Sequence, residues 1–399
     1  MAILNGSAHR ATMETRRDDA GGDDGEDAGG DRRERSRAAA EPGRRAALLP
    51  EHDALAAELT PAALLDLYRE MRILRRIDDE ATALQRQGEL GLWPPVRGQE
   101  AAQLASARAL TPGDFVFTSY REHGLALHRG VRGADLVKVW RGVAGTGWNP
   151  HEIRLATQQV IIGAHTLHAV GWALGETIER GEQHPDAAVA YLGDGAMSEG
   201  DVAEAMVFAA SFRLPVIFFC QNNQWAISEP VTLQAPGELA DRGLGFGIPS
   251  VRVDGNDALA VYAVTREALE RAHTGGGPTL IEAVTYRMGP HTTADDPTRY
   301  RTAEEVAAWA ERDPIDRLAA LLRSEGVLDD EAEREVAAAA DAAAAELRAG
   351  CVALADPEPL AVFDHVYAEP NRTIERERAE YQRYLAGFAD ANGFVEVDR

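Results

Sequence analysis

Short apolar runs alternate with longer amphipathic stretches through the middle of the chain. The apolar runs are bounded by turn-forming residues and lie at 114–120, 187–193, 215–221, 251–255 and 279–286. Between them are stretches in which apolar residues recur at helical spacing, such as 164–181 and 258–275. Apolar strands that alternate with helices are typical of a parallel sheet covered on both faces. The pattern therefore predicts an α/β fold with a parallel sheet and helices on both faces.

The two flanks of this region differ from it. Residues 1–48 combine charge and glycine with few large apolar side chains, which predicts a disordered tail; a docking arm that orders on a partner is the alternative. Order is expected near Thr60, a helix cap followed by Pro61 at the first helical position. Beyond residue 300 only helical patterns remain. We therefore predict an α/β domain over 49–300 and a C-terminal helical extension of the same domain over 301–399.

Composition excludes several classes of protein. The net charge of −24 argues against a nucleic-acid partner, because the phosphate backbone favours basic surfaces. The two cysteines, Cys220 and Cys351, cannot form a disulfide framework or a four-cysteine zinc site. The single lysine, Lys138, is not in a GxxxxGK loop, which excludes a P-loop NTPase. With no long apolar run and no signal-peptide pattern, no membrane association is expected, and a bacterial cytoplasmic location is predicted.

The segment 191–228 carries the strongest chemical signal. A buried strand ends at Gly-Asp-Gly, a helical stretch follows, and the next strand ends at a pair of asparagines. In such a βαβ unit both strand ends reach the same edge of the sheet, so Asp194 and Asn223 become neighbours. The amides of Gly195 and Ala196 then lie near a helix N-terminus, which favours phosphate.

Mg²⁺ typically takes one or two protein oxygens together with phosphate oxygens, so this segment predicts a metal–diphosphate site. Ser198 or Asp201 is the expected cap of the intervening helix. The alternative is that both polar motifs are ordinary turns. Their spacing on consecutive parallel strands favours the site.

The segment resembles the thiamine diphosphate motif, in which GDG is followed by NN at a similar distance. GDGAMSEGDVAEA and FFCQNNQWAISEP are similar to the α subunit of the decarboxylating component of 2-oxo acid dehydrogenase complexes, and the resemblance covers most of residues 60–390. It implies the thiamine diphosphate-binding fold, with thiamine diphosphate and Mg²⁺ as cofactors. By this resemblance the metal ligands are Asp194, Asn223 and the carbonyl of Trp225.

Three further segments support the resemblance. SYREHG at 119–124 is similar to the family's YRxHG, which implies that Tyr120 and Arg121 bind the diphosphate. VIIGAHTLHAVG at 160–171 matches the segment whose backbone receives the aminopyrimidine ring, which places Ile162 there.

TYRMGPHTTADDPTRYR at 285–301 resembles the family's active-site loop. The resemblance makes His291 the catalytic residue at the reaction centre and a cofactor contact, with Arg287 near the diphosphate. Thr292 occupies the position of a regulatory serine in mitochondrial relatives.

The chain departs from the family pattern at three places. Gln221 stands where some branched-chain relatives carry an arginine before the asparagine pair. The stretch QVIIGAH at 159–165 lacks the serine and threonine that hold potassium in those relatives, so no potassium site is predicted by that route. Pro290 stands where histidine or alanine is more usual, and it stiffens the approach to His291.

The resemblance implies oxidative decarboxylation of a small 2-oxo acid, with acyl transfer to the lipoyl group of an acyltransferase component. The family's catalytic glutamate comes from a separate β chain, and no second α/β domain precedes residue 399. We therefore expect an α2β2 heterotetramer with the cofactor at the α/β interface. NNQWAISEP and DDPTRYR look closest to bacterial branched-chain members, so 3-methyl-2-oxobutanoate is the expected substrate. Pyruvate and acetoin are the alternatives.

Two other classes of function are less favoured. A nicotinamide-dependent dehydrogenase would need GxGxxG after a strand. The nearest match, GTGWNPH at 145–151, lacks the third glycine and follows no clear strand. A non-catalytic interaction subunit would be expected to lose Asp194, Asn223 or His291, and all three are present.

Overall fold

The computed structural model describes residues 50–180 and 186–389, so the predicted tail over 1–48 lies outside the described residues. A five-stranded parallel sheet forms the centre, in the order β1-β2-β3-β7-β6. Its strands are β1 (Phe115–Phe117), β2 (Ala188–Gly193), β3 (Val216–Asn222), β6 (Ser250–Asp254) and β7 (Thr279–Val284). Each predicted strand is present, and the predicted parallel sheet is confirmed.

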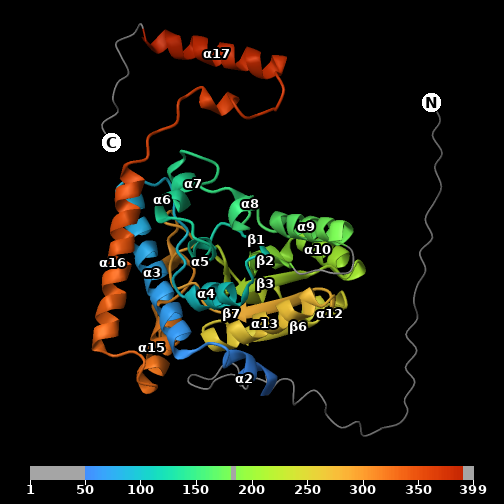
Figure 1. Ribbon diagram of the computed structural model, residues 1–399. Coiled ribbons are helices and arrows are strands. Elements are labelled where there is room, and N and C mark those ends of the chain that lie inside the picture. Colours follow the sequence, from blue (N-terminus) through green and yellow to red (C-terminus); the bar gives the residue numbers. More distant parts are fainter. Residues whose placement is uncertain (1–49, 181–185, 390–399) are drawn as a thin grey trace, which may run out of the picture. The chain divides into compact units, whose positions relative to one another are not determined.

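Helices cover both faces of this sheet (Figure 1). Side chains alternate along β2: Val189 and Tyr191 join one apolar core, and Ala190 and Leu192 join the other. The first core includes α3 (Pro61–Arg86), α4 (Glu100–Ala109) and α13 (Ala258–His273), and the second includes α9 (Ala164–Arg180) and α10 (Gly200–Ser211). Burial on both faces explains why the strands read as continuous apolar runs.

Local signals fixed several helix boundaries. The side chain of Thr60 accepts a hydrogen bond from the Ala63 amide at 3.2 Å and caps α3, as predicted. The helical pattern after residue 300 is divided into α14 (Ala303–Ala310) and α15 (Pro314–Ser324). Pro314 has no N–H to continue the first helix, and Asp313 caps the second by accepting from the Ile315 amide at 2.9 Å.

The C-terminal helices begin with α16 (Asp330–Val352), which packs against α3 and α6 (Gly133–Leu136). Its buried positions follow helical spacing and include two alanines, which allow close approach of the neighbouring helices: Val336, Ala340, Ala344, Leu347 and Cys351. The last helix, α17 (Arg372–Ala389), contacts η3 (Ala361–Phe363), and Arg378 pairs with Asp364 at 2.6 Å.

Short elements connect these parts. They are α2 (Pro50–Ala56), α5 (His123–His128), α7 (Lys138–Arg141), α8 (Pro150–Ile153), η1 (Gly195–Ser198), β4 (Trp225–Ala226), β5 (Glu229–Pro230), α11 (Val231–Gln234), α12 (Ala240–Gly245) and η2 (Pro297–Arg299). The GTGWNPH segment at 145–151 follows α7 and runs into the start of α8. It follows no strand, so it is not a dinucleotide-binding turn. Both cysteines are buried free thiols. In the described parts of the chain, no helix has the length and apolar character needed to cross a membrane.

Candidate active site

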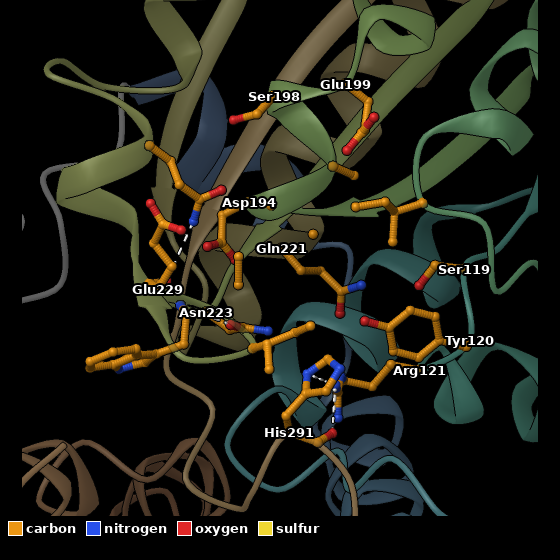
Figure 2. Close-up of a pocket in the computed structure, with 18 of the residues that line it drawn as sticks. Ser119, Tyr120, Arg121, Asp194, Ser198, Glu199, Gln221, Asn223, Glu229 and His291 are labelled. Carbon is orange, nitrogen blue, oxygen red and sulfur yellow. Dashed lines mark hydrogen bonds between the residues drawn. The ribbon is translucent and has the colours of Figure 1, made fainter. Parts of the chain in front are cut away.

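A pocket of about 460 Å³ opens at the carboxyl ends of β2 and β3. Gly193 of β2 is paired in register with Gln221 of β3, so the residues that follow the two strands emerge side by side. Asp194 and Asn223 both line the pocket, as do Tyr120, Arg121 and His291 from other segments (Figure 2). The carboxyl edge of a parallel sheet is where α/β proteins usually bind ligands.

Asp194 is almost fully buried, with 1% of its surface exposed. Its Oδ2 atom has no hydrogen-bond partner among the described residues. Burial raises the pKa of this carboxyl to about 6, although the Asn223 amide and the charge of Arg287 act in the opposite direction. A buried, unpartnered carboxylate oxygen in a pocket wall is suited to a cation that enters with a ligand.

The predicted phosphate-binding amides, those of Gly195 and Ala196, lie in the short turn η1 rather than in α10. A Cβ on Gly195 would come within 2.8 Å of the Cβ of Ala226. Only glycine therefore fits there without displacement of the backbone around Ala226. The prediction that Ser198 or Asp201 caps the helix is wrong. Helix α10 begins after Glu199, which makes no side-chain capping bond, because η1 intervenes between the strand and the helix.

Asn223 is held by hydrogen bonds on both sides of its amide. Its Oδ1 accepts from the Trp225 amide at 3.2 Å, and its Nδ2 donates to Oε1 of Gln99 at 3.1 Å. Gln99 also lines the pocket, and its Nε2 is buried without a partner. These bonds fix the position of Asn223 beside Asp194.

Arg287 is the one predicted site residue that does not line the pocket. It is fully buried and donates to the carbonyl of Trp225 at 3.0 Å and to that of Ile227 at 2.6 Å. Burial and the neighbouring Arg121 lower its pKa to about 10. Ile227 has a left-handed φ of 55°, unusual for a β-branched residue, so Arg287 supports a strained turn beneath the pocket.

His291 lies between two guanidinium groups. Its Nδ1 is 3.2 Å from Nη2 of Arg121 and 3.3 Å from Nη1 of Arg287. Burial and these two positive charges lower its pKa to about 3, so the ring is neutral near pH 7. Because guanidinium groups only donate, Nδ1 must be the acceptor, and the proton then lies on Nε2. His291 therefore presents an N–H donor.

Arg121 and Tyr120 complete this side of the pocket. Arg121 donates to the carbonyls of Pro95 at 2.6 Å and His291 at 2.9 Å, and its guanidinium lies over the ring of Tyr120. The Tyr120 ring meets His291 edge-on at 5.9 Å. Ile162 also lines the pocket and is 38% exposed.

Sequence reasoning assigned no role to several pocket residues: Gln99, Glu122, His165 and Gln234. Glu122 is inside the SYREHG segment and is buried, with its carboxylate accepting from Ser119 at 2.8 Å and from Gln221 at 2.7 Å. His165 follows the 160–163 stretch. Its Nε2–H donates to the Tyr191 carbonyl at 2.6 Å, because a carbonyl oxygen only accepts, and its Nδ1 is buried and unpartnered. For Glu122 and His165, the signal in the sequence was their position within or next to segments already assigned to the site.

No group of three or more His, Cys, Asp or Glu that could hold a metal by itself occurs in the described residues. A metal bound in this pocket would therefore share its coordination between a few protein oxygens and those of a ligand.

Comparison with known proteins identifies the family of the chain. The family model described as dehydrogenase E1 component matches residues 68–350. The 3-methyl-2-oxobutanoate dehydrogenase subunit alpha of Mycobacterium tuberculosis is 47% identical over 330 residues, which cover 82% of this chain and 89% of the relative. The pyruvate dehydrogenase E1 component subunit alpha is 38% identical in Acholeplasma laidlawii, over 83% of this chain and 96% of the relative. The Staphylococcus epidermidis protein of that name is 42% identical, over 71% of this chain and 76% of the relative.

These matches imply thiamine diphosphate as the cofactor, and a β subunit and an acyltransferase as partners. The chain belongs to the dehydrogenase E1 component family of oxidoreductases, as an α-type subunit.

Proposed function

We propose that this chain is the α subunit of a branched-chain 2-oxo acid dehydrogenase, which decarboxylates 3-methyl-2-oxobutanoate oxidatively and passes the acyl group to a lipoyl group. The single observation that carries the proposal is the convergence of Asp194, Asn223, Tyr120, Arg121 and His291 on one pocket. The 47% identity to a 3-methyl-2-oxobutanoate dehydrogenase supports the choice of substrate. We expect the enzyme in the bacterial cytoplasm.

The pocket suits Mg²⁺ and a diphosphate. Asp194 offers a buried carboxylate oxygen without a partner, and Asn223 and the Trp225 carbonyl would supply two further oxygens. Gly195, Ala196, Tyr120 and Arg121 would donate to phosphate oxygens, and the backbone of Ile162 would contact the aminopyrimidine. When bound, thiamine diphosphate supplies the nucleophilic carbon and the electron sink that decarboxylation requires.

His291 is the catalytic residue in this proposal. Its neutral ring directs Nε2–H away from the two arginines, and this N–H would donate to an oxygen of the substrate. Arg287 contributes by position, because its two carbonyl bonds hold the Trp225–Ile227 turn and its charge helps to keep His291 neutral. Activity should therefore show no histidine titration near pH 6.5 that belongs to His291.

An α2β2 assembly with its cofactor at the α/β interface is the expected quaternary structure. Large apolar side chains are exposed beside the pocket and along α9 and α10: Val160, Ile161, Leu167, Ile178, Val207, Phe208 and Phe212. Gly171 and Gly175 lie on α9, and a Cβ at either would meet no other atom. An exposed apolar surface with room for close helix contact supports coverage by another subunit.

The test uses the chain co-expressed with its β subunit. Calorimetry measures the binding of thiamine diphosphate with Mg²⁺, and a dye acceptor then reports oxidation of each 2-oxo acid. We expect binding, and a higher kcat/KM for 3-methyl-2-oxobutanoate than for pyruvate. The chain without its β subunit should show no normal turnover.

Pyruvate is the second candidate substrate, supported by relatives that are 38% and 42% identical to this chain. A higher kcat/KM for pyruvate would replace the branched-chain assignment and leave the pocket assignments in place. Absence of cofactor binding in a folded α/β complex would contradict the pocket assignments themselves.

A further inference from the structure

Glu122 is a buried carboxyl group whose hydrogen-bond donors, on Ser119 and Gln221, are neutral. The hydroxyl of Ser119 donates to Oε2 at 2.8 Å, and Nε2 of Gln221 donates to Oε1 at 2.7 Å. The neighbouring cation, Arg121, instead donates to Pro95 and to His291. A buried carboxylate without a paired cation is costly, and the pocket beside it is the one assigned above to an anion.

Gln221 connects this carboxylate to the pocket. It ends β3 opposite Gly193, and its side chain extends toward the segment of Ser119 and Tyr120 (Figure 2). Its Nε2 is occupied by Glu122, whereas its Oε1 is buried without a partner. This orientation places an acceptor where a phosphate would need a donor, because phosphate oxygens only accept.

Protonation of Glu122 would reverse the orientation. A neutral carboxyl group donates its own O–H and needs an acceptor. The Gln221 amide that contacts Glu122 through Nε2 carries such an acceptor, Oε1, which has no other partner. Rotation of the amide about its last bond would make that bond and release Nε2 toward the pocket. The proton comes from solvent, and no other bond is made or broken.

The surrounding charges favour this change when an anion enters. Arg121 is adjacent and positive, Tyr191 on β2 interacts with Glu122, and Asp194 and His291 line the same pocket. A diphosphate adds negative charge near Glu122, which disfavours the ionised carboxylate. Burial already raises the pKa of Glu122, against the opposing effects of Ser119, Gln221 and Arg121.

We propose that Glu122 takes up a proton when the diphosphate of the cofactor binds, and that Gln221 then donates its amide to a phosphate oxygen. This inference rests on the proposed function, because it requires the diphosphate to occupy this pocket. Glu122 is a positioning residue that acts through Gln221. Cofactor affinity therefore falls as pH rises through the range in which free Glu122 is ionised, by up to about tenfold per pH unit.

Calorimetry of the α/β complex tests the proposal directly. Thiamine diphosphate is titrated at saturating Mg²⁺, at several pH values, in buffers of different ionisation enthalpy. The slope of the observed binding enthalpy against the ionisation enthalpy of the buffer gives the number of protons taken up. Glu122→Gln imitates the neutral carboxyl group, so we expect it to take up fewer protons than the wild type, by up to about one. Its affinity should also depend less on pH.

The matched control is Glu229→Gln, at an exposed glutamate on the rim of the same pocket. It should take up as many protons as the wild type. A second variant, Gln221→Met, removes the amide donor of Glu122 and leaves only the donors of Ser119. The ionised carboxylate is then less favoured, so Glu122 should hold its proton before the cofactor arrives. Proton uptake on binding should again fall, together with cofactor affinity.

The outcomes separate two failures. Binding with equal proton uptake in wild type and Glu122→Gln at every pH overturns the inference and leaves the proposed function standing. No binding of thiamine diphosphate to the folded wild-type complex at any pH overturns the proposed function. Circular dichroism of each variant establishes that the complex is folded before either result is read.

Discussion

Two buried aspartates at opposite ends of the same strands have opposite surroundings. Asp114 lies at the amino ends of β1 and β2 and is 0% exposed, and Asp194 lies at the carboxyl end of β2 and is 1% exposed. Asp114 accepts from the amides of Thr111 at 2.7 Å and Ala187 at 2.8 Å, with Nε2 of His273 at 2.7 Å. Asp194 keeps one carboxylate oxygen without any partner.

The pKa values of the two carboxyls move in opposite directions. Burial tends to raise the pKa of Asp114, but His273 and the two amides outweigh it and the pKa is lowered. Burial prevails at Asp194 and raises its pKa to about 6. A saturated buried carboxylate stabilises the fold, whereas an unsaturated one destabilises it until a ligand completes it. The hydrogen bonding of a buried carboxylate therefore distinguishes an acid that stabilises the fold, such as Asp114, from one available to a ligand, such as Asp194.

The largest effect is expected from Asp194→Asn. The loss of the carboxylate should weaken binding of thiamine diphosphate with Mg²⁺ roughly 100-fold or more, because the metal loses its charged ligand. The free energy of unfolding without cofactor should not fall, because a buried, incompletely paired charge is removed. Calorimetry and urea unfolding measure the two quantities. Unchanged cofactor affinity would remove Asp194 from the metal site.

The opposite result is expected from Asp114→Ala. The buried amide of Ala187 and the partly buried amide of Thr111 lose their acceptor, and His273 loses its partner. The free energy of unfolding should therefore fall by about 3 kcal/mol. Cofactor affinity should be unchanged, since Asp114 is not among the residues that line the pocket.

Asp341→Asn is the control for burial. Its side chain is 72% exposed and pairs with Arg76 at 2.9 Å. The free energy of unfolding, measured in urea, should therefore change by less than about 1 kcal/mol. An equal loss of stability at Asp114 and Asp341 would show that burial is not what makes Asp114 structural.

Asp78 on α3 is intermediate and tests the comparison through pH. It accepts from Nε1 of Trp93 at 2.8 Å and from the Val96 amide at 3.0 Å. Burial raises its pKa to about 7 despite these bonds. Because the pKa is raised on folding, the contribution of Asp78 to the free energy of unfolding is complete below pH 3.8, the pKa of an ordinary aspartate. This contribution is lost as pH rises through about 7.

Asp78→Asn cannot ionise, so its stability relative to wild type should increase between about pH 4 and 7 and then level off. The total change should be about 2 kcal/mol, after allowance for relaxation of the buried site. Urea unfolding of both proteins across this range measures the difference. A constant difference at all pH values would mean that Asp78 titrates alike in the folded and unfolded chains.

Much of the fold could be predicted from local pattern. The five apolar runs became the five strands, and Thr60 caps α3 as its sequence signature indicates. The two polar motifs after consecutive strands came together because parallel strand ends share one edge. Pro314 divides the helical pattern after residue 300 into two helices, because proline cannot continue a helix.

The caps of α10 could not be read in the same way. Ser198 and Asp201 are good capping residues, yet the chain inserts η1 between β2 and α10 and begins the helix after Glu199. The glycine at 195 permits that tight turn against Ala226. Capping propensity therefore gave way to the close approach of two backbone segments.

The sequence by itself determined the strands, most helices, and the pairing of Asp194 with Asn223, because each follows from spacing along a short stretch of chain. Only the tertiary structure decided which acids are satisfied, which way His291 presents its proton, and that Glu122 bonds Gln221 rather than Arg121. The physical reason is that burial, hydrogen bonding and electrostatic interaction add contributions from residues distant in sequence. Their sum at a given side chain exists only once the chain has folded.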